Sequence, residues 1–318
     1  MTVSREEATY AYRLILGREP ESEQVLEQAM AAQNLAHLRQ VFLGSMEFAQ
    51  KYESSPERLL PIGRFFEAPS VDIDIACTPE QLQAMFDRIG KAWQAFGETE
   101  PHWSVLTNDV FRQENLAANI EHFYGSGHAD VDVHLNFLRR AGLPVSFDKV
   151  LDFGCGVGRL TLALASHART AVGVDISPPH LKLAVEQADK QAITNVEFEA
   201  IGSVNDLDRY RDFDFVLSRI VLQHNPPPVM AAIYAKLLAA LARGGVAVVQ
   251  MPTYMHERHF SAADYLASEQ PQMEMNALPQ PIIYRLIEEA DCRLIEVRED
   301  GSAGNMPALS HTFVVQRR

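Results

Sequence analysis

The stretch KVLDFGCGVGRLTLALASHARTAVGVDIS, residues 149–177, decides the fold. It opens with a short, mostly apolar run, 150–153, and continues through the glycine-rich turn GCGVG at 154–158 into a segment of helix-forming composition. A second apolar run, 171–174, ends at Asp175. This order predicts a strand, a glycine turn, a helix and a second strand parallel to the first.

The ends of these two strands predict a binding site. Parallel strands joined by a crossover helix bind ligands outside their carboxyl ends, so the glycine turn and Asp175 face one crevice. Glycines let the backbone approach a ligand closely, and their amides lie near a helix N-terminus. Because Asp175 is placed to accept hydrogen bonds from ribose hydroxyls, the stretch predicts a site for an adenosine-type cofactor.

Two details choose among such cofactors. The dinucleotide fingerprint G-x-G-x-x-G requires a small residue at its last position, where this chain has Arg159. Asp152 lies two residues before the first glycine, and its carboxylate repels a pyrophosphate but suits a ligand with a free amino group. S-adenosylmethionine has a sulfonium, an ammonium group and no phosphate. The pattern therefore favours S-adenosylmethionine.

The stretches DFGCGVG and GVDIS closely resemble the first two motifs of the class I S-adenosylmethionine-dependent methyltransferases. Three later segments strengthen the resemblance: SPPHL at 177–181, RIVLQHNPPPVM at 219–230 and GGVAVVQMPTY at 244–254. Residues 100–318 resemble the bacterial small-molecule methyltransferases of polysaccharide and secondary-metabolite pathways. The resemblance implies an α/β fold with a Rossmann-like, seven-stranded, mostly parallel sheet and helices on both faces.

The resemblance also assigns cofactor contacts. Helices before the first strand fold over the cofactor in many methyltransferases, and here the sequence YGSGH at 124–128 either supplies a hydroxyl to the methionine carboxylate or forms an ordinary interhelical turn. The usual acid that contacts adenine is replaced by GSVND at 202–206, so Ser203, Asp206 or a backbone carbonyl must take its place. The expected cofactor-binding residues are Tyr124, Ser126, Asp152, Gly154, Cys155, Gly156, Asp175, Ile176, Ser203, Val204, Ser218 and Arg219.

Methyl transfer from a sulfonium needs mainly alignment and desolvation, but a hydroxyl acceptor also benefits from a base, for which histidine fits neutral pH. His224 is the first candidate base because its loop flanks the transferable methyl, and a structural histidine under the cofactor is the alternative. His128 and His256 follow. The expected substrate residues come from three segments: Trp103 from the polar-aromatic residues 101–107, His128 from YGSGH, and Tyr254, His256 and Arg258 from the insert described next.

A long insert, Pro252 to Pro281, separates the fifth strand from the last helix. Connections longer than about 12–15 residues are usually functional or disordered, and we expect this one to cover the carboxyl ends of the strands as a substrate lid. Its HERH sequence at 256–259 lacks the H-E-x-x-H spacing and a third ligand, so we expect no metal site.

The chain before the core predicts separate units. Residues 1–55 look helical, and YRLILGREP and FLGSMEF within them resemble a small helical module of bacterial surface-polysaccharide enzymes and secreted repeat proteins. The prolines in residues 56–78 predict a linker. Residues 79–318 are expected to form a methyltransferase domain. Within it we expect a helical cap at 79–147 and a Rossmann-like core at 148–318, which carries the lid 252–281. Core packing explains an apolar stripe in the cap: Leu82, Met85, Phe86, Ile89, Trp93 and Phe96.

Composition limits the partners and the compartment. A formal net charge of −14 disfavours a nucleic-acid partner. Three widely spaced cysteines, the absence of a visible signal peptide and the absence of an apolar run near ~20 residues predict a cytoplasmic protein without a membrane span. We expect a small-molecule or saccharide substrate, and a protein partner or self-association through the N-terminal module.

The sequence thus predicts an S-adenosylmethionine-dependent methyltransferase that acts on a hydroxyl of a sugar, a glycan precursor or another polar small molecule. The alternative is a catalytically silent scaffold that binds S-adenosylmethionine in a surface-polysaccharide pathway. A nucleic-acid amino-methyltransferase is disfavoured, because the HNPPP run at 224–228 lacks the aromatic residue of an N-P-P-Y motif and begins too late after the fourth strand.

Overall fold

The chain folds into two compact units, Met1–Ala68 and Pro69–Arg318. The structure is a computed structural model that describes residues 3–48, 51, 70–269, 273–304 and 308–318. Most of the predicted linker, 56–69, lies outside the described residues.

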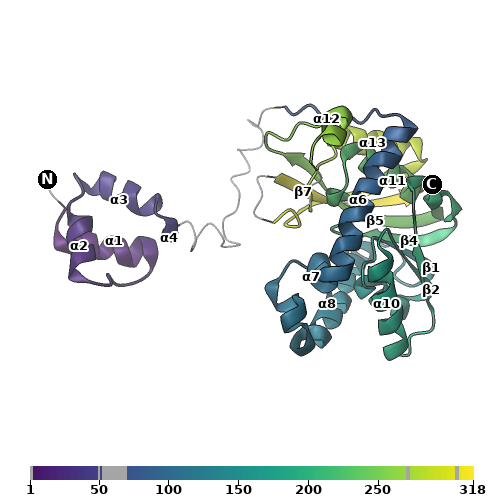
Figure 1. Ribbon diagram of the computed structural model, residues 1–318, viewed down its shortest axis with the longest axis horizontal. Helices are drawn as coiled ribbons and strands as arrows, with labels where there is room; N and C mark the ends of the chain where they lie inside the picture. Colours follow the sequence, from purple (N-terminus) through teal and green to yellow (C-terminus); the bar gives the residue numbers. More distant parts are fainter. Residues whose placement is uncertain (1–2, 49–50, 52–69, 270–272, 305–307) are drawn as a thin grey trace. The chain divides into compact units, whose positions relative to one another are not determined.

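The first unit is a helical module (Figure 1). Its elements are α1 (Arg5–Ala11), the π-helical turn η1 (Tyr12–Leu16), α2 (Glu23–Met30), α3 (Leu35–Leu43) and α4 (Met46–Phe48). Ser4 begins α1 with a capping box that includes Glu7. A small apolar core that includes Leu16, Leu38 and Phe42 holds the helices together.

The second unit is built on one seven-stranded sheet with the order β3-β2-β1-β4-β5-β7-β6 (Figure 1). The strands are β1 (Phe147–Phe153), β2 (Ala168–Asp175), β3 (Val196–Ala200), β4 (Phe213–Ser218), β5 (Leu241–Met255), β6 (Cys292–Asp300) and β7 (Ala308–Arg317). Only β7 runs antiparallel to its neighbours, β5 and β6. The predicted Rossmann-like, mostly parallel sheet is confirmed.

Helices cover both faces of this sheet. The longer ones are α6 (Pro79–Thr99), α8 (Gln113–Arg140), α10 (Pro178–Lys190), α11 (Pro227–Ala239) and α13 (Gln280–Glu289). The shorter elements are α7 (Pro101–Val105), η3 (Asp109–Phe111), α9 (Arg159–Leu164), η4 (Ala165–His167), η5 (Val204–Arg209), η6 (Leu222–His224) and α12 (Ala262–Ala267).

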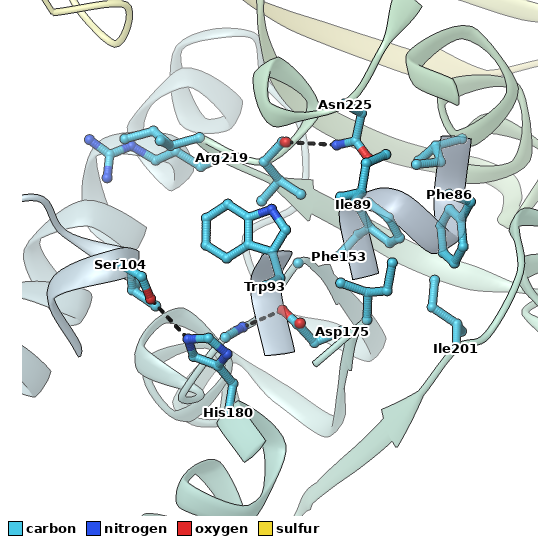
Figure 2. Close-up of a pocket in the computed structure, with 17 residues that line it drawn as sticks. Phe86, Ile89, Trp93, Ser104, Phe153, Asp175, His180, Ile201, Arg219 and Asn225 are labelled. Carbon is cyan, nitrogen blue, oxygen red and sulfur yellow. Dashed lines mark hydrogen bonds between the residues drawn. The ribbon is translucent and has the colours of Figure 1, made fainter. Parts of the chain in front are cut away.

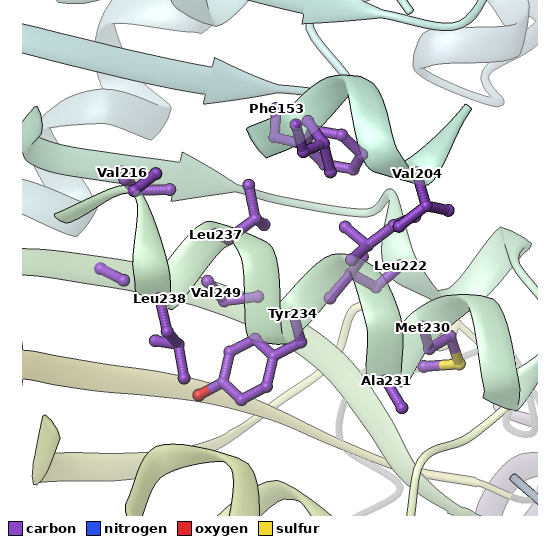
Figure 3. Packing of buried hydrophobic residues seen from close by; sticks show 14 of the residues in the cluster. Phe153, Val204, Val216, Leu222, Met230, Ala231, Tyr234, Leu237, Leu238 and Val249 are labelled. Carbon is purple, nitrogen blue, oxygen red and sulfur yellow. The ribbon is translucent and has the colours of Figure 1, made fainter. Parts of the chain in front are cut away.

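Alternate strand residues face opposite cores, as the period of two requires. In β1, Leu151 and Phe153 join the core formed with α6, α11 and α13, where Tyr234 and Leu237 pack (Figure 3). Val150 faces the other core, formed with α8 and α9. Strands buried on both faces explain the near-continuous apolar runs of the sequence.

The polar-aromatic residues 101–105 form the short helix α7. Two boundaries differ from the prediction. Residues 124–128 lie inside the continuous helix α8 and form no interhelical turn. β5 continues to Met255 through its pairing with β7, so the predicted lid begins later than Pro252.

One of the two glycines of helix α8 lies against a neighbouring helix. A Cβ added at Gly127 would lie 2.3 Å from the carbonyl oxygen of Arg159, so only glycine permits this approach of α8 to α9. A Cβ added at Gly125 would meet nothing within 4 Å.

This contrast gives a matched pair of substitutions in one helix. Gly127→Ala should lower the free energy of unfolding by about 1–3 kcal/mol through overpacking. Gly125→Ala should raise it by about 0.5–1 kcal/mol through helix propensity. Urea unfolding measures both, and equal effects at the two positions would contradict the packing found here.

Candidate functional site

Several polar groups converge at the carboxyl ends of β1, β2 and β4, where the strand order reverses. A cavity there, called the main cavity, lies between the sheet and the helices α6 and α7 (Figure 2). Its lining residues are Phe86, Ile89, Trp93, Ser104, Val105, Phe153, Gly154, Gly156, Asp175, Ile176, His180, Ile201, Arg219, Ile220, Val221, Asn225 and Ile233.

The glycine turn is tied to the end of β2. The N–H groups of Gly154 and Cys155 donate to the carbonyl of Val174, at 2.7 and 3.1 Å. One oxygen of Asp175, Oδ2, accepts the N–H of Gly156 at 2.8 Å, and the other accepts the N–H of Ser177 at 2.8 Å. Asp175 therefore shapes the turn and still presents free lone pairs beside the cavity.

A smaller cavity continues from the main one along the glycine turn and adds Asp152, Cys155 and Arg159 to its walls. Asp152 is 2% exposed, and its Oδ2 accepts the hydroxyl of Thr161 at 2.6 Å. Burial raises the pKa of Asp152 to about 6, against the effects of the Thr161 hydrogen bond and of Arg159. This carboxylate is consequently less stable in its charged form than an exposed one.

Two guanidinium groups meet beside Asp152. Arg159 and Arg219 both contact Oδ2 of Asp130, each at 2.7 Å, and Ser126 accepts a further hydrogen bond from Arg159 at 3.0 Å. The Nε of Arg159 is buried without a hydrogen-bond partner among the described residues. Two guanidiniums next to a buried carboxylate can bind the carboxylate and the ammonium of an amino acid.

Helices α6 and α7 close the cavity over the glycine turn. Trp93 lies in the middle of the view in Figure 2, and His180 lies within hydrogen-bond distance of Ser104 at 2.9 Å. A Cβ added at Gly154 would lie 2.4 Å from Val221, and one at Gly156 would lie 2.7 Å from Val105. Both glycines therefore accept side chains packed directly on the turn.

The structure brings together about half of the expected cofactor residues. Gly154, Gly156, Asp175, Ile176 and Arg219 line the main cavity, and Asp152 and Cys155 line the smaller one. Ser126 accepts a hydrogen bond from Arg159 but does not line either cavity. Tyr124 lines a separate pocket between α8 and α10, and neither cavity includes Ser203, Val204 or Ser218.

The candidate base His224 is not among the residues that line either cavity. Its Nδ1 donates to the carbonyl of Glu274 at 2.8 Å, and its ring lies 5.2 Å from that of Trp93. Burial lowers the pKa of His224 to about 4, so the ring is neutral at pH 7. Its Nε2 lies 3.4 Å from the amide nitrogen of Gln223, which covers the lone pair a base would use.

The expected substrate residues do not converge. His128 lines the pocket between α8 and α10, and Arg258 lines another pocket together with Asp72 and Tyr265. Tyr254 and His256 contact each other at 3.5 Å, and the guanidinium of Arg112 covers the ring of Trp103.

Sequence reasoning missed the residues that the cap contributes. The apolar stripe of α6, interpreted as core packing, also supplies Phe86, Ile89 and Trp93 to the cavity wall. Ser104, Val105 and His180 lie in two segments that the sequence analysis noted, 101–107 and SPPHL, but their place at the cavity depends on how α7 and α10 meet. Among the missed residues, Arg159 is the one whose position directly after the glycine turn could have indicated a role at the site. The sequence analysis noted it only as a departure from the dinucleotide fingerprint.

Two further features concern metals and membranes. Among the described residues, no group of three or more His, Cys, Asp or Glu side chains is arranged to hold a metal ion. Within the same part of the chain, every helix is too short or too polar to cross a bilayer.

This chain is similar in sequence to known methyltransferases. Residues 150–245 match the family described as a methyltransferase domain. The mitochondrial ubiquinone biosynthesis O-methyltransferase of Arabidopsis thaliana is 36% identical over 227 residues, which cover 67% of this chain and 69% of that protein.

Two more similarities cover a smaller share of this chain. A 23S rRNA (uracil(1939)-C(5))-methyltransferase of Francisella tularensis subsp. novicida is 38% identical over 71 residues, 21% of this chain, and the chain spans only 16% of that protein's length. The crystal structure of magnesium protoporphyrin IX methyltransferase from Synechocystis PCC 6803 with bound SAM has 19% identity and a TM-score of 0.45, and the match covers 61% of this chain and 81% of that one.

The raised pKa of Asp152 predicts how stability depends on pH. The folded state resists ionisation of this carboxyl, so the protein loses stability as pH rises from about 4 through about 6. Asp152→Asn keeps an acceptor for Thr161 and removes this loss. Without ligand, the variant should exceed the wild type by on the order of 2–3 kcal/mol in the free energy of unfolding at pH 7.5, and the difference should shrink towards pH 4. A difference that does not vary with pH would contradict this prediction.

Proposed function

Because the chain belongs to the class I S-adenosylmethionine-dependent methyltransferases, we propose that it transfers the methyl group of S-adenosylmethionine to a hydroxyl of a sugar or another polar small molecule. One observation carries the proposal: the glycine turn, Asp175 and Arg219 converge on a single cavity at the carboxyl ends of the parallel strands. Ligands of open α/β sheets bind in this position.

The residues of the two cavities fit this cofactor from end to end. Asp175 would hold the ribose hydroxyls, and the apolar walls formed by Phe86, Ile89 and Ile201 suit the adenine ring. At the other end, Asp152 would face the ammonium group of the methionine part and Arg159 its carboxylate, using the Nε that lacks a partner. The bound cofactor supplies an electrophilic methyl group on a sulfonium.

The chain's own contribution to the reaction is positioning and exclusion of water. Trp93, Val105 and Val221 place apolar surface around the glycine turn. Displacement at a sulfonium spreads charge between reactants, so a dry, aligned site accelerates it without an obligatory catalytic side chain. His224 is proposed as a packing residue that supports Trp93, since its nitrogens are engaged by Glu274 and Gln223.

Charge and similarity support a small acceptor. The net charge of −14 makes an anionic polymer an unfavourable partner. The Arabidopsis relative, an O-methyltransferase, matches 67% of this chain, whereas the ribosomal RNA methyltransferase matches 21%.

A labelling experiment tests the proposed reaction. The protein is incubated with methyl-labelled S-adenosylmethionine and three acceptor pools: free and nucleotide-linked sugars, phenolic small molecules, and total RNA. We expect label on a hydroxyl of a small molecule. Label confined to RNA would contradict the proposed acceptor class, and tight cofactor binding with no transfer to any pool would favour a silent scaffold.

Asp175→Ala tests the cofactor assignment. The substitution removes the acceptor for ribose and the hydrogen bond to Gly156, so S-adenosylhomocysteine should bind at least about tenfold more weakly by calorimetry. Asp214→Ala is the matched control, because Asp214 also accepts two backbone N–H groups, those of Asp148 and Lys149, near the starts of β4 and β1, and does not line the cavity. Equal losses in the two variants, or binding of NAD by the wild type in place of S-adenosylhomocysteine, would contradict the assignment.

A further inference from the structure

The loop between β4 and α11 contains a strained residue. Ile220 has a φ of 58°, and among the five described residues other than glycine with positive φ it is the only β-branched one. This left-handed conformation is unfavourable for a branched side chain and persists only where the surroundings hold it. Ile220 lines both cavities, so the strain lies at the site itself.

One buried amide holds Ile220 in this conformation. Gln250, in the middle of β5, is 1% exposed, and its Oε1 accepts the N–H of Ile220 at 2.8 Å. Its Nε2 donates to Oε1 of Gln223 at 3.1 Å and to the hydroxyl of Ser310 at 2.7 Å. A single side chain thus bonds two positions of the loop to the central sheet.

These three contacts require an amide. The position must offer one acceptor to the backbone N–H and two donors to neighbouring oxygens, which is the capacity of a glutamine side chain. Leucine of similar size offers neither, and a buried carboxylate lacks the donors. A buried glutamine inside an otherwise apolar strand, VAVVQM, is therefore explained by the loop and not by the core.

The residues on either side of Ile220 contact the cap and the glycine turn. Arg219 reaches Asp130 at 2.7 Å, and Val221 packs directly on Gly154 of the glycine turn. If Ile220 relaxed to negative φ, the chain direction would change between these two side chains and both would leave their positions.

We propose that Gln250 is a positioning residue for cofactor binding: it holds Ile220 in the left-handed conformation and thereby fixes Arg219 and Val221 against the glycine turn. The inference rests on the proposed function, since the ligand that benefits is S-adenosylmethionine. Gln250 acts through the loop and does not itself line either cavity.

A double-mutant cycle tests the proposal with S-adenosylhomocysteine binding measured by calorimetry. Gln250→Leu should weaken binding about tenfold, equivalent to about 1.4 kcal/mol. In the Ile220→Gly background the same substitution should weaken binding less than about threefold, because glycine adopts positive φ without strain and has less need of the amide. The cycle cancels the effect of the lost Ile220 side chain.

Thr253→Val is the control on the same strand. Thr253 is a buried polar residue whose hydroxyl bonds to His311 at 2.9 Å and has no hydrogen bond to the loop. It should lower the melting temperature and leave affinity unchanged. Equal losses for Gln250→Leu in both backgrounds, or a Gln250→Leu variant with wild-type affinity, would overturn the proposal.

A second readout works without any ligand and separates this proposal from the proposed function. The chain has two tryptophans, so Trp103→Phe leaves Trp93, whose ring lies 5.2 Å from that of His224 at the end of the loop. Gln250→Leu should shift the emission of Trp93 to longer wavelength, and Ile220→Gly should suppress the shift. If the wild type binds no S-adenosylhomocysteine, the proposed function fails, whereas an unchanged Trp93 emission rejects the positioning role alone.

Discussion

The hydrogen bond between the carboxylate of Asp175 and the N–H of Gly156 joins the two strand ends on which the site depends. It closes the glycine turn against β2 and keeps the amides of the turn and the free lone pairs of Asp175 on one side of the sheet. Positive φ at Gly154, Gly156 and Gly158 makes this turn possible, and the packing of Val105 and Val221 on it follows from the missing side chains.

The fold was largely predictable because its signals are local. The apolar runs before Gly154 and Asp175 are buried parallel strands, and such near-continuous apolar runs are visible without tertiary knowledge. The errors arose where tertiary packing overrides local preference. Tyr124 to His128, with two glycines, has the composition of a turn, yet it remains helical because Gly127 permits contact with the backbone of Arg159.

The site was predictable where it is built from the ends of the first two strands and, at Arg219, from the end of the fourth. Asp152, the glycine turn and Asp175 follow from one continuous motif. Trp93, Ser104 and His180 come from three helices, and no spacing in the sequence indicates that they meet. His224 is the opposite case: its position in the chain suggested chemistry, whereas its ring is buried and both nitrogens have partners, which supports the proposed packing role.

The central claim is that the cavity above Gly156 and Asp175 is the S-adenosylmethionine site, and a crystal structure with S-adenosylhomocysteine tests it most directly. The account predicts the ribose within hydrogen-bond distance of Asp175 and the amino-acid end beside Asp152 and Arg159. A ligand found in the pocket between α8 and α10, or one bound without contact to Asp175, would contradict it.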